Sequence, residues 1–406
     1  MHRLSGTFYG ATLALAILES LSLAEIGAGQ AEPEEKLEVS WAAPDHKIAA
    51  IPFESPNNMI LLHVSINGSK PLWFALDSGS SVCLIDLSRA KALGLQFESS
   101  TQGQGAGAGT YTVQVIRGAV DFGFAGLTIT VAPAGAMDLS SIEPDVGHPV
   151  DGILGYDVFE KLVVTADYLS HQVTFAAPEA FHPLQEARSL QLTFQDRVPL
   201  VQGRITIPGN PPADAQFLVD TGSGDAVDHP LIKKSTGKLL QIVTGVGLGQ
   251  ELSGVAGRIE TLQLGPFELH GAVSACCGGS DLSSRLIGGQ ILRRFTVIFD
   301  YSHQRLLLKP NDDYHQPFSA DQSGLQLRLE PATGELVVHA VAKDSGAADA
   351  GLRSGDVIVA VGKVRSSEIG LAKLRRMFEA NSGKYNLTVR RGGETLDVPM
   401  RLRPLL

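Results

Sequence analysis

Cysteine, aromatic residues and clusters of basic charge are all scarce in this sequence. Only 3 of the 406 residues are Cys and 6% are aromatic, and no run of Lys or Arg interrupts a chain of net charge -10. An acidic chain without a basic stretch is not expected to bind nucleic acid. The 11 His residues are scattered, and neither CxxC nor HExxH occurs. We therefore predict no metal and no other cofactor.

Three cysteines are also too few for a disulfide scaffold. We predict that Cys83, Cys276 and Cys277 are buried thiols. The alternative is one bridge between Cys83 and a member of the neighbouring pair, which an oxidising compartment would permit.

Long hydrophobic runs are missing beyond the N-terminus. No later stretch reaches the roughly 18 continuous apolar residues that a membrane-spanning helix needs. At the start, His2 and Arg3 precede an apolar segment at 11–18 and then small residues, a pattern typical of a secretory signal. We predict that residues 1–31 are a signal peptide, or an N-terminal anchor if uncleaved, and that the chain is periplasmic or secreted. The alternative is a disordered or fold-capping segment.

Glycine, by contrast, is abundant at 44 residues, and apolar residues alternate with polar ones over short stretches. Leu262, Leu264, Phe267 and Leu269 show this alternation on either side of a Gly-Pro turn. The pattern is typical of half-buried antiparallel strands joined by tight turns. We predict a mainly β protein.

Two parts of the chain follow the same order of motifs. In the stretches WFALDSG and QFLVDTG, a hydrophobic strand leads into Asp77 and Asp220. Each stretch is followed by a Gly-rich segment and by alternating strands. A hydrophobic-hydrophobic-Gly motif then follows, at 153–155 and at 286–288. A strand ending in Asp-Tyr and a Ser-His-Gln turn come next in both. The interval from the Asp to the Gly of the second motif is 78 residues in the first part and 68 in the second, and the extra length fits the loop DLSSIEPDVGHPVDG. Such a repeat predicts two lobes of similar fold.

An Asp at the end of a buried strand needs hydrogen bonds or a partner group, because burying an unpaired carboxylate costs free energy. If the two lobes pack about a pseudo-twofold axis, Asp77 and Asp220 meet, and adjacent carboxylates share a proton. The ionised one would then activate a water and the protonated one would polarise a scissile carbonyl. Three pairs of residues are expected to position the two carboxyls. The hydroxyls of Ser78 and Thr221 would bond across the lobes, and Gly79 and Gly222 would allow the two backbones to approach closely. The hydroxyls of Ser80 and Ser223 would bond the outer carboxylate oxygens.

With these paired triplets and Gly motifs, the chain resembles the retropepsin-type aspartic peptidase family, with both lobes in one chain as in pepsin-like enzymes. The resemblance implies two homologous β-barrel lobes, predicted at 45–178 and 189–311, with Asp77 and Asp220 as the catalytic residues. It also implies mobile flaps that close over the substrate. The matching residues are Gly105, Gly107, Tyr111, Gly247 and Gly249, for which plain flexible loops and an ordinary strand tyrosine are the alternatives.

The second lobe departs from this pattern just after its Asp. The first lobe continues with the apolar residues 82–85, whereas the second places Asp225 and Asp228 there. Like charges near the pair would raise its pKa values.

Residues 321–404 resemble a PDZ domain of the bacterial exported-protease type. The cues are SGLQL, SGAADAGLRSGDVIVAVGK and the amphipathic SEIGLAKLRRMFE. The resemblance implies a small α+β domain that binds C-terminal tails by strand addition, with backbone N–H groups holding the carboxylate. The residues implied for peptide binding are Gly324, Leu325, Gln326 and Leu327. The alternative is a domain that only packs against the lobes.

The sequence as a whole predicts a monomeric aspartic endopeptidase that acts on polypeptides, with a PDZ module for substrate recruitment or regulation. A catalytically inactive, two-lobed peptide-binding or scaffold protein is the alternative. A serine hydrolase is disfavoured because no GxSxG motif occurs.

Overall fold

The computed structural model describes most of the chain after the N-terminal segment. The described residues are 36–43, 45, 47–104, 110–124, 126–247, 250–276, 285–379 and 383–406. The predicted signal peptide and three of the predicted flap residues, Gly105, Gly107 and Gly249, lie outside them. Within them, no helix combines the length and apolar character needed to cross a bilayer.

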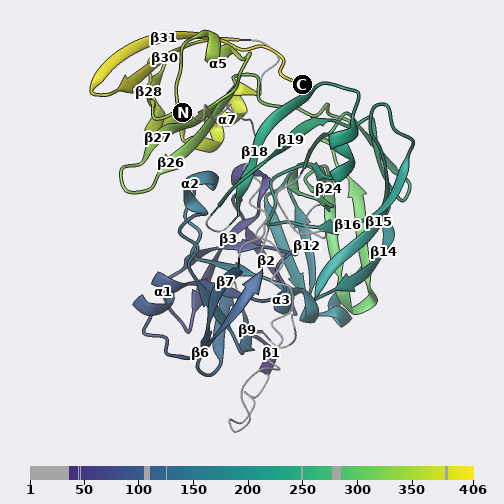
Figure 1. Cartoon of the computed structure of the whole chain (residues 1–406). Coiled ribbons are helices and arrows are strands. Elements are labelled where there is room, and N and C mark those ends of the chain that lie inside the picture. The colour runs from purple at the N-terminus through teal and green to yellow at the C-terminus, as the bar shows by residue number, and fades with distance from the viewer. Residues whose placement is uncertain are drawn as a thin grey trace.

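The first lobe, purple to blue in Figure 1, is built on a 10-stranded sheet in the order β1-β9-β8-β3-β4-β11-β5-β10-β7-β6. Alternation along each strand directs one face to the core: in β9, Leu127, Ile129 and Val131 are buried while the residues between them are half-buried. The elements are β1 (Lys36–Trp41), β3 (Leu61–Ile66), β4 (Leu72–Leu76), β5 (Leu84–Asp86), β6 (Phe97–Gln104), β7 (Thr110–Ile116), β8 (Val120–Phe124), β9 (Leu127–Ala132), β10 (Gly135–Met137) and β11 (Gly152–Leu154), with helices α1 (Leu87–Ala92), α2 (Glu143–Val146) and α3 (Tyr156–Lys161).

The second lobe belongs to a 15-stranded sheet that also takes strands from the first half of the chain. Its order is β18-β19-β22-β17-β23-β16-β15-β14-β25-β24-β12-β13-β2, with β20 and β21 branching from β15. The elements are β2 (Ile48–Pro52), β12 (Val163–Asp167), β13 (Gln172–Ala176), β14 (Arg188–Gln195), β15 (Val198–Thr206), β16 (Ala213–Val219), β17 (Val227–Asp228), β18 (Leu239–Gly247), β19 (Gln250–Arg258), β20 (Thr261–Leu264), β21 (Phe267–His270), β22 (Val273–Cys276), β23 (Leu286–Ile287), β24 (Phe295–Asp300) and β25 (Arg305–Pro310), with α4 (Gly289–Leu292).

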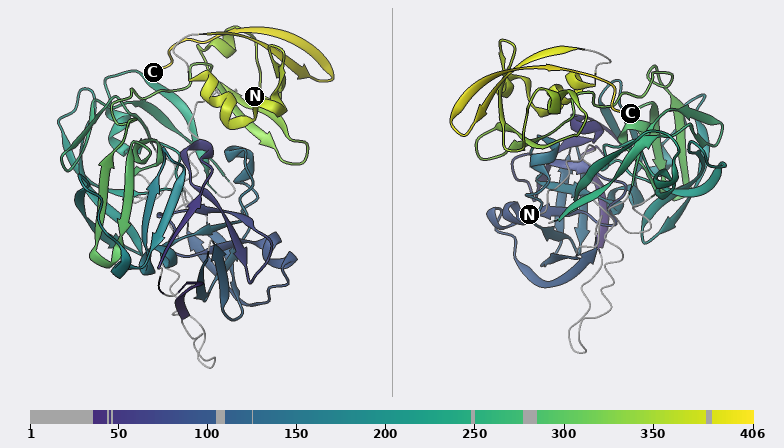
Figure 2. Two further views of the ribbon diagram at one scale, coloured as in Figure 1. Left: turned by 180° about the vertical axis from the view of Figure 1, so that it is seen from behind. Right: turned by 45° about the horizontal axis from the view of Figure 1, so that its top comes forward.

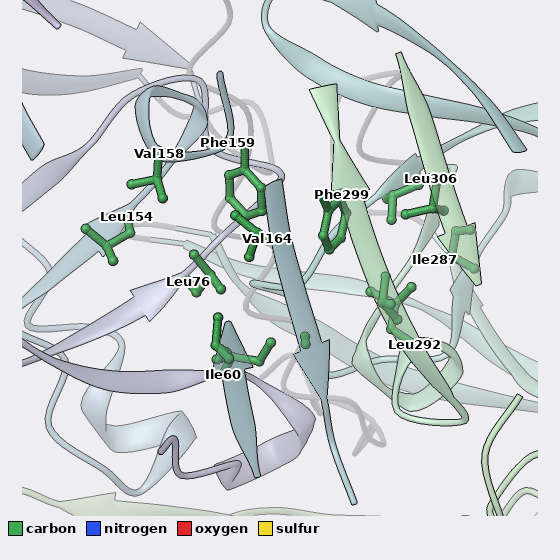
Figure 3. Packing of buried hydrophobic residues seen from close by; sticks show 14 of the residues in the cluster. Ile60, Leu76, Leu154, Val158, Phe159, Val164, Ile287, Leu292, Phe299 and Leu306 are labelled. Carbon is green, nitrogen blue, oxygen red and sulfur yellow. The ribbon is translucent and has the colours of Figure 1, made fainter. Parts of the chain in front are cut away.

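The two lobes share one hydrophobic core. β12 pairs antiparallel with β24, which places Val164 opposite Phe299. Phe159 meets Phe299 edge-on, with ring centroids 5.2 Å apart. One cluster of buried residues continues from Leu76 in the first lobe to Ile287 in the second (Figure 3). Because this core is continuous, it fixes how the strand ends of one lobe meet those of the other.

The C-terminal module has its own core and a 6-stranded sheet in the order β26-β27-β28-β30-β31, with β29 beside β28. In its longest helix, Leu371, Leu374 and Phe378 are buried at helical spacing. The module sits at one end of the molecule, next to both lobes (Figures 1 and 2). Its elements are β26 (Leu325–Glu330), β27 (Glu335–Val341), β28 (Val357–Val361), β29 (Val364–Arg365), β30 (Lys384–Arg391) and β31 (Glu394–Arg401), with α5 (Gly346–Asp349), α6 (Ser366–Ile369) and α7 (Leu371–Phe378).

The cysteines differ from the prediction of three thiols. Cys83 is free and buried, and its Sγ accepts the backbone N–H of Gly155 at 3.4 Å. Cys276, however, is disulfide-bonded. Since Cys83 is a free thiol, the alternative bridge from Cys83 is also wrong.

Candidate active site

Asp77 and Asp220 each follow a strand in matching surroundings. β4 runs parallel to β11, and β16 runs parallel to β23. The backbone N–H of Asp77 donates to the Leu154 carbonyl at 2.9 Å, and that of Asp220 donates to the Ile287 carbonyl at 3.0 Å. The two hydrophobic-hydrophobic-Gly segments of the sequence therefore hold the two Asp loops in the same way.

The two Asp side chains meet where the lobes join. A Cβ placed on Gly222 would lie 2.5 Å from Oδ2 of Asp77, and one placed on Gly79 would lie 2.9 Å from Oδ1 of Asp220. Both distances are too short for any side chain, so each Gly provides the space that the opposite carboxyl occupies. Asp77 is 0% exposed and Asp220 is 1% exposed. The fold thus brings two buried carboxyls together.

Ser78 and Thr221 exchange hydrogen bonds across the lobe interface. Ser78 Oγ donates to the Val219 carbonyl and Thr221 Oγ1 donates to the Leu76 carbonyl, both at 2.7 Å. Each hydroxyl oxygen also accepts the backbone N–H of the other residue, at 2.9 and 3.1 Å. These four reciprocal bonds tie the ends of β4 and β16 to each other and so fix the distance between the Asp loops.

Backbone N–H groups hold one oxygen of each carboxyl. Gly79 N–H donates to Asp77 Oδ1 at 2.8 Å, Gly222 N–H donates to Asp220 Oδ1 at 2.8 Å, and Ser223 N–H adds a second bond to Asp220 Oδ1 at 3.1 Å. Oδ2 of both carboxyls is buried, and within the described part of the chain no group other than the opposite carboxyl can donate a hydrogen bond to it. The loops therefore fix one oxygen and leave the other for the partner carboxyl or a reactant.

Burial raises the pKa of both carboxyls. The pKa of Asp77 lies well above its usual value, first because of burial and second because of the neighbouring Asp220. Burial also raises the pKa of Asp220 to about 7, although hydrogen bonds from Asp77, Gly222 and Ser223 act in the opposite direction. Neighbouring carboxyls titrate as a pair. The pair is therefore expected to hold at least one proton near neutral pH.

The hydroxyls of Ser80 and Ser223 do not reach the carboxylates, contrary to the prediction. Ser80 Oγ donates to the Val82 carbonyl at 2.9 Å, and Ser223 Oγ accepts the backbone N–H of Asp225 at 3.3 Å. Serine in a tight turn readily bonds the backbone two residues further on, and this local bond prevails here. Ser223 supports Asp220 through its backbone N–H instead.

Two of the residues predicted for the flaps can be located. Tyr111 lies in β7 opposite Gly103 and is 9% exposed, packed in a cluster that includes Met59. This position suits the alternative of an ordinary strand tyrosine. Gly247 ends β18, opposite Gln250. A flap role for either residue stays a prediction.

The acidic residues that follow Asp220 affect its charge state. Asp225 raises the pKa of Asp220. Asp228 is buried in β17, and its pKa is raised first by burial and then by Asp225 and Asp220. In the described part of the chain, no group of three or more His, Cys, Asp or Glu residues is arranged to hold a metal ion. The second lobe thus places two acidic groups beside the pair, where the described residues of the first lobe place none.

A contact from the first lobe to the second Asp loop is absent from the sequence-based predictions. Asn58 Nδ2 donates to the Gly224 carbonyl at 2.9 Å, and Asn58 Oδ1 accepts from Arg293 Nη1 at 3.1 Å. A Cβ on Gly224 would overlap the Asn57 carbonyl. Both asparagines have positive φ, 51° and 61°. The only sequence signal is the Pro-Asn-Asn run, because Asn tolerates this backbone region better than most residues.

Two cavities lie near the Asp loops, and neither is lined by the Asp pair. One of about 240 Å³ lies between the second lobe and the C-terminal module and is lined in part by Gly224 and Asp225. The other, of about 570 Å³, lies between the first lobe and the turn at Asp196 and Arg197 of the second lobe, and is lined in part by Val82. Since Asp77 and Asp220 are almost fully buried, any molecule that reaches them must displace the residues that cover them.

The residues predicted to bind peptide in the C-terminal module lie at its edge strand. Gly324 precedes β26, residues 325–327 begin it, and β26 has a strand partner, β27, on one side only in the described sheet. Gly324 N–H donates to Asp321 Oδ1 at 2.7 Å and Leu325 N–H donates to Ser323 Oγ at 2.9 Å. The N–H groups expected to hold a peptide carboxylate are thus used within the chain. Their role in peptide binding stays a prediction.

Comparison with known proteins agrees with this architecture. Residues 62–158 match the family model "Aspartyl protease", and residues 337–391 match the model "PDZ domain". No curated protein is significantly similar in sequence. Among solved structures, an aspartic proteinase from Irpex lacteus is 14% identical with a TM-score of 0.44, and the match covers 66% of this chain and 99% of that one. This structural likeness is too weak to support a conclusion by itself.

The family matches and the paired Asp loops bear out the resemblance seen in the sequence. The predicted fold class, mainly β with two lobes and a small α+β module, is confirmed. The chain has an aspartic-peptidase-like fold followed by a C-terminal PDZ domain.

Proposed function

We propose that this protein is an aspartic endopeptidase that hydrolyses peptide bonds with a water activated between Asp77 and Asp220. The observation that carries the proposal is the meeting of two buried carboxyls whose pKa values are both raised. Such a pair retains one proton over a wide pH range, and this gives it an acid and a base at one site.

In the proposed reaction the ionised carboxylate takes a proton from water as the water oxygen attacks the scissile carbonyl carbon. The protonated carboxyl donates a hydrogen bond to the carbonyl oxygen as negative charge develops there. A proton then passes to the amide nitrogen, the C–N bond breaks, and an acid and an amine are released. Ser78 and Thr221 hold the two Asp loops in register, and Gly79 and Gly222 admit the opposing carboxyls.

The proposed substrates are extended polypeptide segments, because only an extended chain can enter between two loops. The proposal includes export of the protein to the periplasm or the exterior, on the strength of the N-terminal sequence pattern. The PDZ domain would recruit substrates or regulate their access.

The test is cleavage of casein by the purified protein and by Asp77→Asn and Asp220→Asn. Each substitution removes the general acid–base pair and is expected to lower kcat/KM by at least about a thousandfold. Asp312→Asn, at an exposed position away from the Asp loops, is the matched control and should cleave like the wild type. Undiminished cleavage by either Asn variant would reject the mechanism. Peptide binding without turnover at any pH from about 3 to about 8 would favour the alternative of a non-catalytic peptide-binding protein.

A further inference from the structure

The loop that lengthens the first lobe contacts the PDZ domain. It contains α2, which packs along β26, the strand at the edge of the PDZ sheet (Figure 1). The loop is anchored in its own lobe by Ile142 and Val146, both buried in a first-lobe cluster. The corresponding interval of the second lobe, from Asp220 to Gly288, is 68 residues long against 78 from Asp77 to Gly155. The loop that makes the first lobe longer thus covers the β26 edge of the PDZ sheet.

A buried acidic residue fastens this contact. Asp145 is 3% exposed, and its Oδ1 accepts from Nε of Arg328 in β26 at 2.7 Å. Arg375 in α7 donates from Nη1 to the Asp145 backbone carbonyl at 2.6 Å and from Nη2 to the Leu327 carbonyl at 2.7 Å. Arg375 therefore joins α7, β26 and the α2 loop, and Arg328 neutralises the buried carboxylate of Asp145.

Close packing leaves no room for another chain at this edge. Gly147 directly follows α2, and a Cβ placed on it would lie 2.7 Å from Cβ of Leu371, the first residue of α7. β26, α7 and α2 thus surround the place where an added strand would have to lie. A sheet edge covered in this way cannot pair with a peptide until the cover moves.

The chain also fills the carboxylate loop of the PDZ domain. Oδ1 of Asp321 accepts the backbone N–H groups of Ser323 and Gly324 at 2.9 and 2.7 Å, and the Ser323 hydroxyl donates to the same carboxyl at 2.9 Å. These are the donors that a bound C-terminal carboxylate would need. An internal carboxylate therefore stands where the terminus of a peptide is expected.

We propose that the peptide-binding site of the PDZ domain is occupied by its own chain, with the α2 loop at the strand edge and Asp321 in the carboxylate loop. In this state the domain is clamped to the first lobe. An external polypeptide binds only by displacing the α2 loop, and it must offer an acidic residue to Arg328 beside a small residue that can approach Leu371. The proposal concerns binding alone and does not depend on peptidase activity.

The test uses the full chain with Asp77→Asn as background, so that no probe is cleaved. Asp145→Arg places like charges together and should release the α2 loop. Amide hydrogen exchange in residues 139–150 and 325–330 is then expected to rise at least about tenfold, while exchange in β30 and β31 stays unchanged and shows that the domain is folded. Glu143→Gln, on the same helix but without a side-chain bond to the PDZ domain, is the matched control. Arg328→Gln opens the same pair from the other side.

The second readout is binding of a fluorescein-labelled peptide with the sequence SSIEPDVGH, residues 140–148. The Asp145→Arg protein should bind it at least about tenfold more tightly than the background protein, because the internal competitor is gone. The peptide SSIEPRVGH should bind neither. Unchanged exchange in both Asp145→Arg and Arg328→Gln would overturn the proposal. So would an opened edge that binds the acidic peptide no better than the background protein does.

Discussion

The two lobes hold their Asp residues alike but differ in what surrounds them. In both, a strand end is pinned to a parallel neighbour, a Gly N–H supports one carboxyl oxygen at 2.8 Å, and a hydroxyl crosses to the other lobe at 2.7 Å. Beyond this shared frame, the second lobe continues with Asp225 and Asp228, while the first continues with apolar residues. The two lobes therefore position their Asp residues by the same kinds of contact, whereas the acidic surroundings of the two residues differ.

The lobes also differ in their attachments. Asn57 and Asn58 of the first lobe brace the Asp loop of the second lobe, and the α2 loop of the first lobe meets the PDZ domain. The first lobe thus acts as the support for both other parts of the molecule. Substitutions at matched positions of the two lobes can therefore separate the contacts that the lobes share from those that only one lobe has.

The largest effect is expected from filling the space at the two loop glycines. Gly222→Ala should lower the free energy of unfolding by about 3 kcal/mol and Gly79→Ala by about 1 to 2 kcal/mol, because the approach to the opposite carboxyl is closer at Gly222. Both should lower casein cleavage by about a hundredfold, since the carboxyls are pushed apart. Urea denaturation and initial rates measure the two effects. Gly237→Ala, whose added Cβ would stay 3.3 Å or more from its neighbours, is the control. Equal stability of all three variants would contradict the close approach.

A smaller effect is expected from the crossing hydroxyls. Ser78→Ala and Thr221→Val each leave a buried carbonyl and a buried N–H without a partner, so each should cost about 2 kcal/mol of unfolding free energy. Because the two residues form one network, the double variant should cost less than the sum. Chemical denaturation of the four proteins provides this cycle. Strict additivity would mean that the two hydroxyls act independently and would break the proposed symmetry.

The smallest effect is expected from the charge that only the second lobe carries. Activity needs one carboxylate of the pair ionised, so it should rise as the pH rises through the pKa of Asp220, about 7. Asp225→Asn removes a like charge that raises this pKa, so the acid limb of the kcat/KM profile should move to lower pH, by about one unit or less. Asp312→Asn should leave the profile in place. A shift to higher pH would show that the sign assigned to Asp225 is wrong.

The local frame of the lobes could be predicted from the sequence because short-range rules determine it. The alternating Leu262, Leu264, Phe267 and Leu269 predict half-buried strands, as the structure shows. An Asp after a hydrophobic run predicts a strand that ends in a hydrogen-bonded carboxyl group. The pairing of Asp77 with Asp220 followed from two equal motifs and the expectation of a twofold packing. Each of these inferences needs only neighbours in the chain or one assumed symmetry.

What the sequence could not supply depends on packing between distant segments. The Asn58 contact with Gly224 joins residues on different lobes, and the Asp145 contact with Arg328 joins a lobe to the PDZ domain. The residues next to Asn58 and Asp145 in the sequence do not indicate which distant residue each of them contacts. The prediction for the Ser80 hydroxyl was wrong for the opposite reason, because a short-range contact prevailed. The hydroxyl donates to the nearby Val82 carbonyl and not to the carboxylate.

The central claim, that Asp77 and Asp220 share a proton, is tested most directly by infrared spectroscopy of the carboxyl groups at about pH 8, above the pKa of Asp220, which is about 7. An isolated Asp is ionised at this pH. The difference spectrum of wild type minus Asp77→Asn should therefore contain a protonated-carboxyl band that belongs to the pair. Wild type minus Asp312→Asn should contain none. A spectrum in which replacing Asp77 removes no protonated carboxyl would contradict the account.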